Sequence, residues 1–430
     1  MELPMIKNFD TLATTSLRHD ALAILETGYE AVLTERVIES EVELRGEDIC
    51  IKGRSICLSD YDRVFFVGIG KCAVDASLVF ERILGDRITD GVVIDVKSGI
   101  FKRLRSYVGT HPFPSKQNVS ATKEVVNMLR GVTERDLILT VISGGGSALL
   151  CLPHDLECET MREITEALWK RGADITDVNT VRKHTSDILG GQLAKFAYPA
   201  TVVSFLFSDV PGNDIGVIAS GPTVRDETTI DDAERILAKY DVRTEHALLS
   251  FPLTETPKDE KYFSRVMNIL LVTNERALLA MKNKAEELGY QTEIRDMKLQ
   301  GIASELGRLL ASDAIPKKSC VLYGGETTVN IIGNGEGGRN QEFVLGAVPT
   351  IPSNTVIVAA ASDGWDNTNV AGAIGDAGDR ERAQARGLFA EQFLLANDSY
   401  RFWELIGGAI MTGRTGINVA DFYMVLKGDD

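Results

Sequence analysis

The strongest constraint on the fold is a series of short apolar runs that end in glycine, each followed by a helical pattern. Four of them lie in the first half of the chain: RVFFVGIG (63–70), GVVIDVKSG (91–99), DLILTVISGGGS (136–147) and ATVVSFLFSDVPG (200–212). Continuous Val, Ile and Leu runs are typical of parallel strands buried on both faces, and intervening helices give βαβ units. The sequence therefore predicts an α/β fold with a doubly wound sheet in its N-terminal domain.

A polar segment, LTETPKDEKY (253–262), separates this half from the rest of the chain. Because it contains proline and lacks apolar periodicity, we expect a domain boundary there, with domains of residues 1–255 and 256–430. The second domain is also expected to be α/β. The other predicted elements are a helix over 16–43 that either tolerates Gly28 or breaks there, strands at 267–274, 319–326, 327–333 and 354–364, and a helix at 275–288.

The chain is acidic, with 62 Asp and Glu residues against 46 Lys and Arg residues and a formal net charge of −16. Such a surface repels polyphosphate backbones, so we expect no nucleic-acid partner and no membrane partner. The six cysteines form no regular framework, and the N-terminus lacks the pattern of a signal peptide. These features predict a soluble, cytoplasmic protein with small-molecule substrates. A homodimer is expected only because two-fold dimers are the commonest soluble oligomers.

The first glycine-rich turn, Gly68–Ala73, follows the first apolar run and satisfies the G-x-G-x-x-A form of the dinucleotide fingerprint. Asp95, in the next predicted strand, is then a candidate for the acid that binds a ribose. Lys71 lies where the following helix begins, although the Walker pattern fails here. Lys71 is therefore either a clamp for phosphate or carboxylate, or a solvated surface lysine.

The second turn carries three consecutive glycines between a predicted strand and a predicted helix. Backbone amides in such a turn bind phosphate, and a tight strand-to-helix corner is the alternative. The residues concerned are Ser143, Gly144, Gly145, Gly146 and Ser147.

Two aspartates follow other predicted strands, Asp209 in S-D-V-P-G and Asp363 in S-D-G-W-D. A carboxylate at a strand end holds Mg²⁺ or accepts a proton from a substrate hydroxyl. The alternative for both is a cap that stabilises the local turn.

Further glycines lead from Glu326 to Arg339 and Asn340, and the planar guanidinium suits carboxylate or phosphate. A hairpin with a flexible tip is the alternative. The run N-T-V-R-K-H (179–184) is basic in an acidic chain and either lines an anion site or is a solvated helical turn. His111, in G-T-H-P, is expected to be structural more often than catalytic.

Together these motifs resemble the glycerate 2-kinase family, whose C-terminal part is called the MOFRL domain. The motifs are G-I-G-K, S-G-G-G-S-A-L, N-x-V-R-K-H, S-D-V-P-G with S-G-P-T, and G-G-E-x-T-V with G-x-G-G-R-N-Q-E. They occur in the order of the family, from about residue 60 to the C-terminus.

The resemblance implies an ATP- and Mg²⁺-dependent kinase that converts D-glycerate to 2-phosphoglycerate. It also implies a Rossmann-like N-terminal domain with a nucleotide site, a C-terminal MOFRL-type domain, and an active site in the cleft between them. The essential lysine, aspartate and arginine of the family fall on Lys71, Asp209 and Arg339. The segment after Asp363 departs from the family pattern, which leaves roles for Asp366 and Thr368 open.

These expectations give each candidate residue a role. The turn Ser143–Ser147 is expected to bind ATP phosphates, and Asp209 and Asp363 to hold Mg²⁺. Asp209 is also a candidate base, and the sequence does not separate the two roles. Substrate binding is expected from Lys71, Glu326, Arg339 and Asn340. Two alternatives stay open: a nicotinamide-dependent hydroxypyruvate reductase, and a non-catalytic sugar-phosphate sensor.

Overall fold

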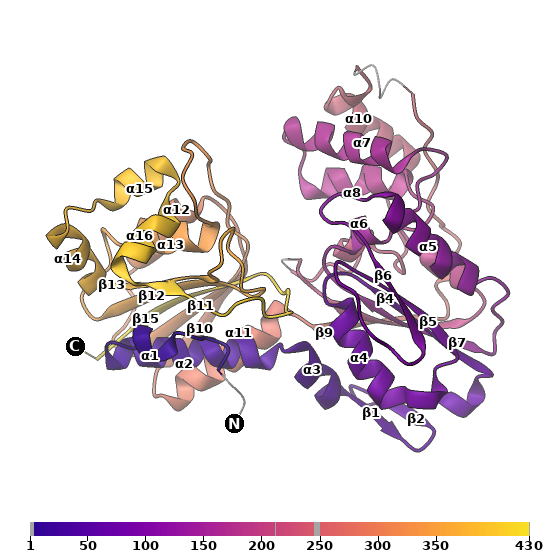
Figure 1. Cartoon of the computed structure of the whole chain (residues 1–430), viewed down its shortest axis with the longest axis horizontal. Coiled ribbons are helices and arrows are strands. Elements are labelled where there is room, and N and C mark those ends of the chain that lie inside the picture. The colour runs from indigo at the N-terminus through magenta and orange to yellow at the C-terminus, as the bar shows by residue number, and fades with distance from the viewer. Residues whose placement is uncertain (1–3, 211, 245–249, 430) are drawn as a thin grey trace. The chain divides into compact units, whose positions relative to one another are not determined.

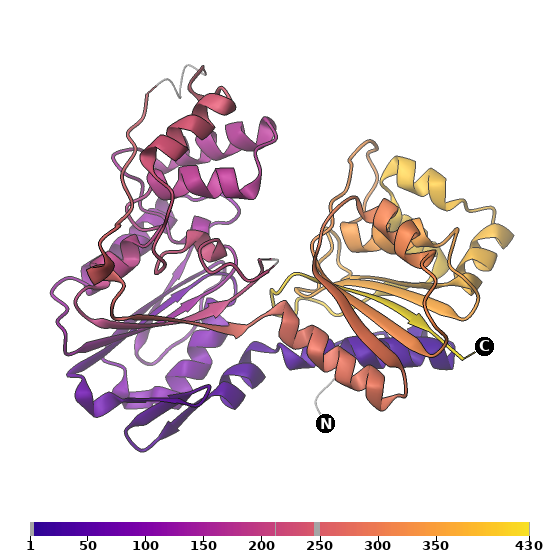
Figure 2. The same cartoon turned by 180° about the vertical axis from the view of Figure 1, so that it is seen from behind.

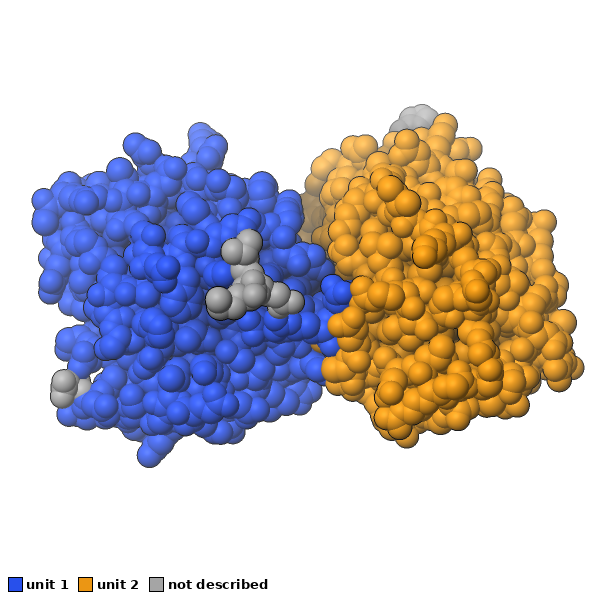
Figure 3. Space-filling view, turned by 60° about the horizontal axis from the view of Figure 1, so that its bottom comes forward, with its two compact units in different colours: residues 1–36, 209–212, 272–430 blue, residues 37–208, 213–271 orange. Residues whose placement is uncertain are grey.

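The computed structural model describes residues 4–210, 212–244 and 250–429, so Pro211 of the S-D-V-P-G motif lies outside the described residues. The chain forms two compact units, shown as a cartoon in Figure 1 and in separate colours in Figure 3. Unit 1 contains Met1–Arg36, Asp209–Gly212 and Val272–Asp430, and unit 2 contains Val37–Ser208 and Asn213–Leu271. This division differs from the domain boundary expected at 255/256, because the N-terminal helices pack with the C-terminal half of the chain.

The central element of unit 2 is a six-stranded sheet in the order β6-β5-β4-β7-β8-β9. Each neighbouring pair from β6 to β8 is parallel. All seven side chains of β7 are buried, as its continuous apolar run predicted. The strands are β4 (Arg63–Ile69), β5 (Asp90–Asp95), β6 (Leu104–Val108), β7 (Asp136–Ile142), β8 (Thr201–Phe207) and β9 (Val266–Val272).

The strand order reverses at β4: the chain continues outward to β5 and β6, and then returns to β7, β8 and β9 on the other side. Right-handed crossovers in opposite directions place α4 (Ala73–Leu84) and α5 (Lys116–Met128) on opposite faces of the sheet (Figure 1). In open α/β sheets, ligands bind beyond the carboxyl ends of the two strands at such a reversal. Here those strands are β4 and β7.

The remaining elements of unit 2 form a small sheet and a set of helices. Its antiparallel sheet contains β1 (Val42–Arg45), β2 (Asp48–Ile51) and β3 (Arg54–Cys57). The helices are α6 (Gly146–Leu149), α7 (Cys158–Lys170), α8 (Ile175–His184), α9 (Gln192–Ala197) and α10 (Ile230–Lys239), while α3 (Thr34–Glu41) spans the division between the units.

Unit 1 is built on a mixed six-stranded sheet in the order β10-β11-β15-β12-β13-β14. Only β10 and β11 pair in parallel, and the other neighbours are antiparallel. The strands are β10 (Gln291–Leu299), β11 (Ser319–Gly325), β12 (Thr355–Ala361), β13 (Gly372–Asp376), β14 (Ala409–Ile410) and β15 (Asp421–Lys427). The α/β fold expected for both halves is thus confirmed.

Helices cover both faces of this sheet. A core that includes Phe343 and Trp403 packs between the sheet and the helices on one face. Figures 1 and 2 both show α2 and α11 side by side on the other face. The helices are α1 (Phe9–Leu12), α2 (Ser16–Ala31), α11 (Asn274–Glu287), α12 (Ala303–Ala311), α13 (Arg339–Ala347), α14 (Ala377–Ala385), α15 (Ala390–Ala396) and α16 (Ser399–Ile406).

The predicted helix over 16–43 breaks, but not at Gly28. α2 continues through Gly28 to Ala31, and α3 begins at Thr34. A Cβ atom at Gly28 would lie 2.7 Å from Cγ of Met281, so this glycine allows α2 to pack closely on α11. Gly28 therefore indicates close packing between two helices and not the end of a helix.

Most predicted strands are present, but the strand expected at 327–333 is wrong. Only an isolated bridge between Ile302 and Thr328 forms there. Ile331 and Ile332 are 81% and 69% exposed, and the side chain of Asn397 accepts hydrogen bonds from the amides of Ile332 and Gly333. The side chain of Asn397 therefore accepts the backbone hydrogen bonds that a neighbouring strand would accept in a sheet. Among the described residues, no helix combines the length and apolar character needed to cross a bilayer.

A buried ion pair joins the N-terminal segment to α14. Nη1 of Arg18, which is 1% exposed, donates to Asp376 at 3.1 Å and to Asp379 at 3.0 Å. We expect Arg18→Ala to lower the free energy of unfolding by about 3–5 kcal/mol, because the fully buried Asp379 keeps only the pair with Arg382 and Asp376 loses its cation. Urea unfolding followed by tryptophan fluorescence measures this, since the buried Trp403 belongs to the same unit.

Arg401→Ala is the control for this substitution, because Arg401 forms an exposed pair with Glu404. Its expected effect is about 0.5 kcal/mol or less. Equal effects of the two substitutions would contradict a stabilising role for the Arg18 pair.

Candidate active site

Two glycine-rich turns of unit 2 touch each other at the carboxyl ends of β4 and β7. The amide of Lys71 donates to the carbonyl of Gly144 at 3.0 Å, and the amide of Ser143 donates to the carbonyl of Ile69 at 2.9 Å. Oγ of Ser143 also accepts from the amide of Cys72 at 3.4 Å. The structure thus brings together Lys71 and the turn Ser143–Ser147.

Glycine is required at Gly70 and Gly145 for this contact. Gly70 has φ of +117°, and a Cβ atom there would lie 2.0 Å from Oγ of Ser143. Gly145 has φ of +82°, and a Cβ atom there would lie 3.1 Å from Cγ of Lys71 and 3.0 Å from the ring of His111. Both positions combine a left-handed backbone with close packing, so no other residue fits them without strain.

The second turn presents backbone donors that the protein itself does not use. Within the described residues, the amides of Gly144, Gly145 and Ser147 have no hydrogen-bond acceptor. Successive unpaired amides in a turn form a concave site for an anion. The turn is therefore suited to phosphate binding.

Lys71 and Arg182 make the surroundings of His111 electropositive. Neither Lys71 nor Arg182 forms an ion pair with any described residue. Burial lowers the pKa of the partly buried Arg182 to about 10. Although His111 keeps contact with solvent, desolvation and the charges of Lys71 and Arg182 lower its pKa to about 4. His111 is therefore neutral at pH 7 and able to donate or accept a hydrogen bond.

A strained segment connects the second turn to α8. Ala219 and Ser220 have φ of 50° and 57°, which is rare for residues with a side chain. Oγ of Ser220 lies 2.9 Å from Oγ of Ser147 and donates to the side-chain oxygen of Asn179 at 3.0 Å. Asn179 lies on α8 one turn before Arg182, so both face the same side of the helix.

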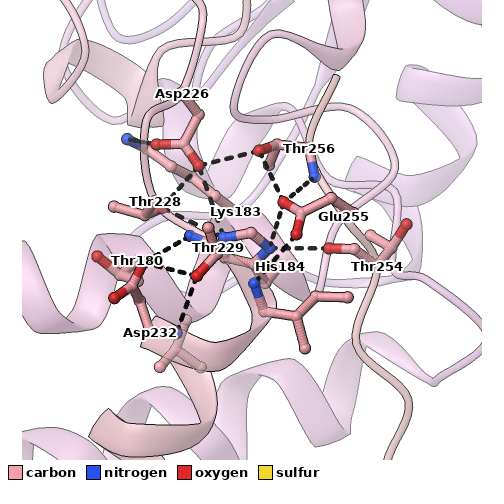
Figure 4. A network of polar contacts seen from close by, with 12 residues as sticks. Thr180, Lys183, His184, Asp226, Thr228, Thr229, Asp232, Thr254, Glu255 and Thr256 are labelled. Carbon is pink, nitrogen blue, oxygen red and sulfur yellow. Dashed lines mark hydrogen bonds and ion pairs between the residues drawn. The ribbon is translucent and has the colours of Figure 1, made fainter. Parts of the chain in front are cut away.

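A polar network holds the opposite side of α8 (Figure 4). Lys183 forms an ion pair with Asp226 at 3.0 Å. The fully buried His184 lies 2.8 Å from the carbonyl of Thr254 and 3.2 Å from the hydroxyl of Thr228. Burial would raise the pKa of Asp226, but Lys183 and the hydroxyl of Thr228 lower it below its ordinary value. The C-terminal turn of α8 is thus fixed on both sides of Arg182.

Arg339 lies in unit 1 and is paired with two carboxylates. Its guanidinium donates to both oxygens of Asp421, at 2.5 and 3.1 Å, and to Glu326 at 2.8 Å. Burial would lower the pKa of Arg339, but Asp421 and Glu326 raise it. Its remaining nitrogen, Nη1, makes no hydrogen bond to a described residue.

Asp366 fixes the start of α13 directly after Arg339. Its carboxylate accepts hydrogen bonds from the amides of Asn340 at 3.1 Å and Gln341 at 2.9 Å, and from both of their side chains. Burial raises the pKa of Asp366 to about 6. Asn340, expected to bind substrate, is fully buried and serves this helix start. Asp366, whose role the sequence left open, thus positions Arg339.

The two predicted metal ligands lie in unit 1 in different surroundings. Asp209 accepts a hydrogen bond from Asn418 at 3.0 Å, and its charge contributes to the raised pKa of Glu326, of which burial is the main cause. Asp363 accepts from the amide of Trp365 at 2.9 Å and lies 3.9 Å from Arg414, which is the pattern of a turn cap. No group of three or more His, Cys, Asp or Glu residues arranged for a metal occurs in the described ranges.

Asp95, the candidate ribose acid of the reductase alternative, is fully buried. It accepts from the amides of Val74 at 2.9 Å and Val96 at 2.6 Å, so it satisfies the first turn of α4. Its carboxylate is therefore occupied by the protein.

The sequence pattern gives no role to Asp421 and does not connect His111 with Arg182. The signal for Asp421 is an aspartate at the start of the apolar run DFYMVLK, where a charge is out of place unless it is paired.

Two family profiles match the chain: DUF4147, a domain of unknown function, over residues 20–250, and the MOFRL family over residues 319–421. A D-glycerate 2-kinase of Thermotoga maritima is 34% identical over 427 residues, which cover 96% of this chain and 98% of that protein. A glycerate 2-kinase of Pyrococcus horikoshii is 34% identical and covers 91% of each chain. A putative hydroxypyruvate reductase of Agrobacterium vitis is 33% identical over 85% of this chain and 87% of its own length.

The fold agrees with these relationships. The crystal structure of the Thermotoga maritima glycerate kinase superposes with a TM-score of 0.85 at 33% identity, over 96% of this chain and 99% of that chain. Both family profiles, the near-complete coverage and the shared fold lead to one assignment: the chain belongs to the glycerate kinase family of DUF4147 and MOFRL domains.

Proposed function

We propose that this protein is a D-glycerate 2-kinase, which transfers the γ-phosphoryl group of ATP to the 2-hydroxyl of D-glycerate and releases ADP and 2-phosphoglycerate. The names of the Thermotoga and Pyrococcus relatives support this reaction. The observation that carries it is the contact between Lys71 and the turn Ser143–Ser147, where an unpaired cation adjoins three unpaired amides. Phosphoryl transfer depends on such positioning and charge neutralisation.

In unit 2, the amides of Gly144, Gly145 and Ser147 bind ATP phosphates. Ser143 fixes the turn through its hydrogen bonds with Ile69 and Cys72. Lys71 lies against Gly145 and neutralises charge on the transferring phosphoryl group. The neutral ring of His111, which also adjoins Gly145, supplies a further hydrogen bond to the same group.

In unit 1, the carboxylate of Asp209 fits Mg²⁺, which takes one or two carboxylates and otherwise binds water and phosphate oxygens. When bound, such an ion would offset negative charge on the phosphates and the repulsion between Asp209 and Glu326. Arg339 holds Glu326 in place and has Nη1 available for the reacting groups. A metal role for Asp363 stays a prediction. We propose that residues of both units are required for turnover.

The first test is ³¹P NMR of the protein incubated with D-glycerate, ATP and Mg²⁺. We expect a 2-phosphoglycerate resonance to grow as ATP is consumed. A 3-phosphoglycerate resonance would contradict the proposed regiospecificity. Absence of transfer, together with saturable NADH binding seen by fluorescence, would favour the reductase alternative.

Replacement of Lys71 tests the site in unit 2. We expect Lys71→Met to lower kcat by about 100-fold or more, because one preorganised charge is removed from the transition state. The pKa of His111 should rise from about 4 toward its ordinary value, because the neighbouring positive charge is lost. Histidine NMR measures the second effect independently of activity.

Lys97→Met is the matched control, because Lys97 forms an exposed pair with Asp75. Its kcat should equal that of the unmodified protein within about twofold. An unchanged pKa of His111 in Lys71→Met would contradict the proximity of the two side chains.

Replacement of Arg339 tests the site in unit 1. Arg339→Gln leaves Asp421 and Glu326 without their cation, so we expect kcat to fall about 100-fold and the KM for substrate to rise. Steady-state kinetics measure both constants. Arg401→Gln is the control in the same unit, and an unchanged kcat/KM in Arg339→Gln would overturn the role of this arginine.

A further inference from the structure

Arg182 is a partly buried cation whose charge no described residue neutralises. No carboxylate of the described ranges pairs with it, in contrast to Arg339 with its two carboxylates. Its guanidinium stacks on the ring of Trp169, with the carbon atom 5.4 Å from the ring centroid. Burial of a cation without a counter-ion is costly, so a bound anion would stabilise this arrangement.

The neighbours of Arg182 fix its position before any ligand arrives. Asn179, one helical turn earlier, is tied to Ser220 beside the phosphate-binding turn. The next two residues, Lys183 and His184, belong to the network of Figure 4. Trp169 itself packs against Phe113, two residues after His111, at a centroid distance of 5.9 Å. Helix α8 and the ring of Trp169 thus restrict where the guanidinium of Arg182 lies.

Arg182 lies in the same region of unit 2 as Lys71, because Asn179 on its side of α8 is hydrogen-bonded to Ser220, which contacts Ser147 of the phosphate-binding turn. After desolvation, the charges of Lys71 and Arg182 also lower the pKa of His111. The places of the two cations within this region differ. The side chains nearest to Gly145 of the phosphate-binding turn are those of Lys71 and His111. Lys71 therefore belongs with the phosphates, and Arg182 is the remaining cation without a counter-ion.

We propose that Arg182 binds the carboxylate of the hydroxy-acid substrate and determines the preference for an acid over a neutral polyol. The inference rests on the proposed kinase function. A hydroxy acid carries one charged group besides its hydroxyls, and a planar guanidinium held on an aromatic ring is suited to bind that group bidentately. Arg339, expected from the sequence to hold substrate, has two carboxylates already and serves the reacting groups instead.

The test compares Arg182→Gln, Arg182→Lys and the control Arg162→Gln in the full-length protein. Arg162 is a matched control because it stacks on Phe113 in the same aromatic group, but it is exposed and paired with Glu166. We expect Arg182→Gln to raise the KM for D-glycerate about 100-fold and to change the KM for ATP by less than about threefold. Arg182→Lys should give an intermediate KM, because it keeps the charge and loses the bidentate geometry. Arg162→Gln should leave both constants unchanged.

An equal rise of the KM for ATP and for D-glycerate, or a rise for ATP alone, would overturn the proposal and assign Arg182 to the phosphates. An unchanged KM for D-glycerate would also overturn it. If circular dichroism shows that Arg182→Gln does not fold, Arg182→Lys decides, and a KM equal to that of the unmodified protein counts against the proposal.

Calorimetric titration with D-glycerate alone separates this inference from the kinase function. If the unmodified protein transfers no phosphate, the kinase function fails. The inference is then still supported if D-glycerate binds to the unmodified protein and about 100-fold more weakly to Arg182→Gln. Equal binding to both proteins, or no binding to either, overturns the inference itself.

Discussion

The close contact between the turns after β4 and β7 is the constraint on which the site in unit 2 depends. A Cβ atom at Gly70 would lie 2.0 Å from Oγ of Ser143, so the contact exists only because residue 70 is glycine. It allows the amide of Lys71 to bond to Gly144 and brings the lysine stem over Gly145. A glycine without reactive groups thus determines where the lysine and the free amides meet, at the reversal of strand order where open α/β sheets bind ligands.

The two units use arginine in different ways. Arg339 is paired with Asp421 and Glu326, and both carboxylates raise its pKa. Arg182 has no such partner among the described residues, and burial lowers its pKa to about 10. Although the chain has a net charge of −16, no carboxylate of the described residues pairs with Arg182. An anion bound there would offset the cost of burying an unpaired cation.

The sequence predicted the parts of the structure that depend on local pattern. Continuous apolar runs identified β4, β5, β7 and β8, and the glycines after them identified the turns that carry Lys71 and Ser143. The apolar run at 327–333 was misassigned because Asn397, distant in sequence, takes the place of a neighbouring strand. The roles of Asp366 and Asp421 were missed for the same reason: each acts on a side chain or helix start far away in the chain.

The strained backbone at Ala219 and Ser220 makes a contact between two parts of unit 2 possible. Each residue in the left-handed region costs about 1–3 kcal/mol, which the surrounding contacts must offset. This backbone conformation places the hydroxyl of Ser220 between Ser147 and Asn179. The turn Ser143–Ser147 is thereby connected to α8. Because the Lys183–Asp226 pair secures the other side of α8, the helix is held from two directions. Phosphoryl transfer depends on fixed geometry, so under the proposed kinase function the strained segment would contribute by holding the turn Ser143–Ser147 and α8 in place.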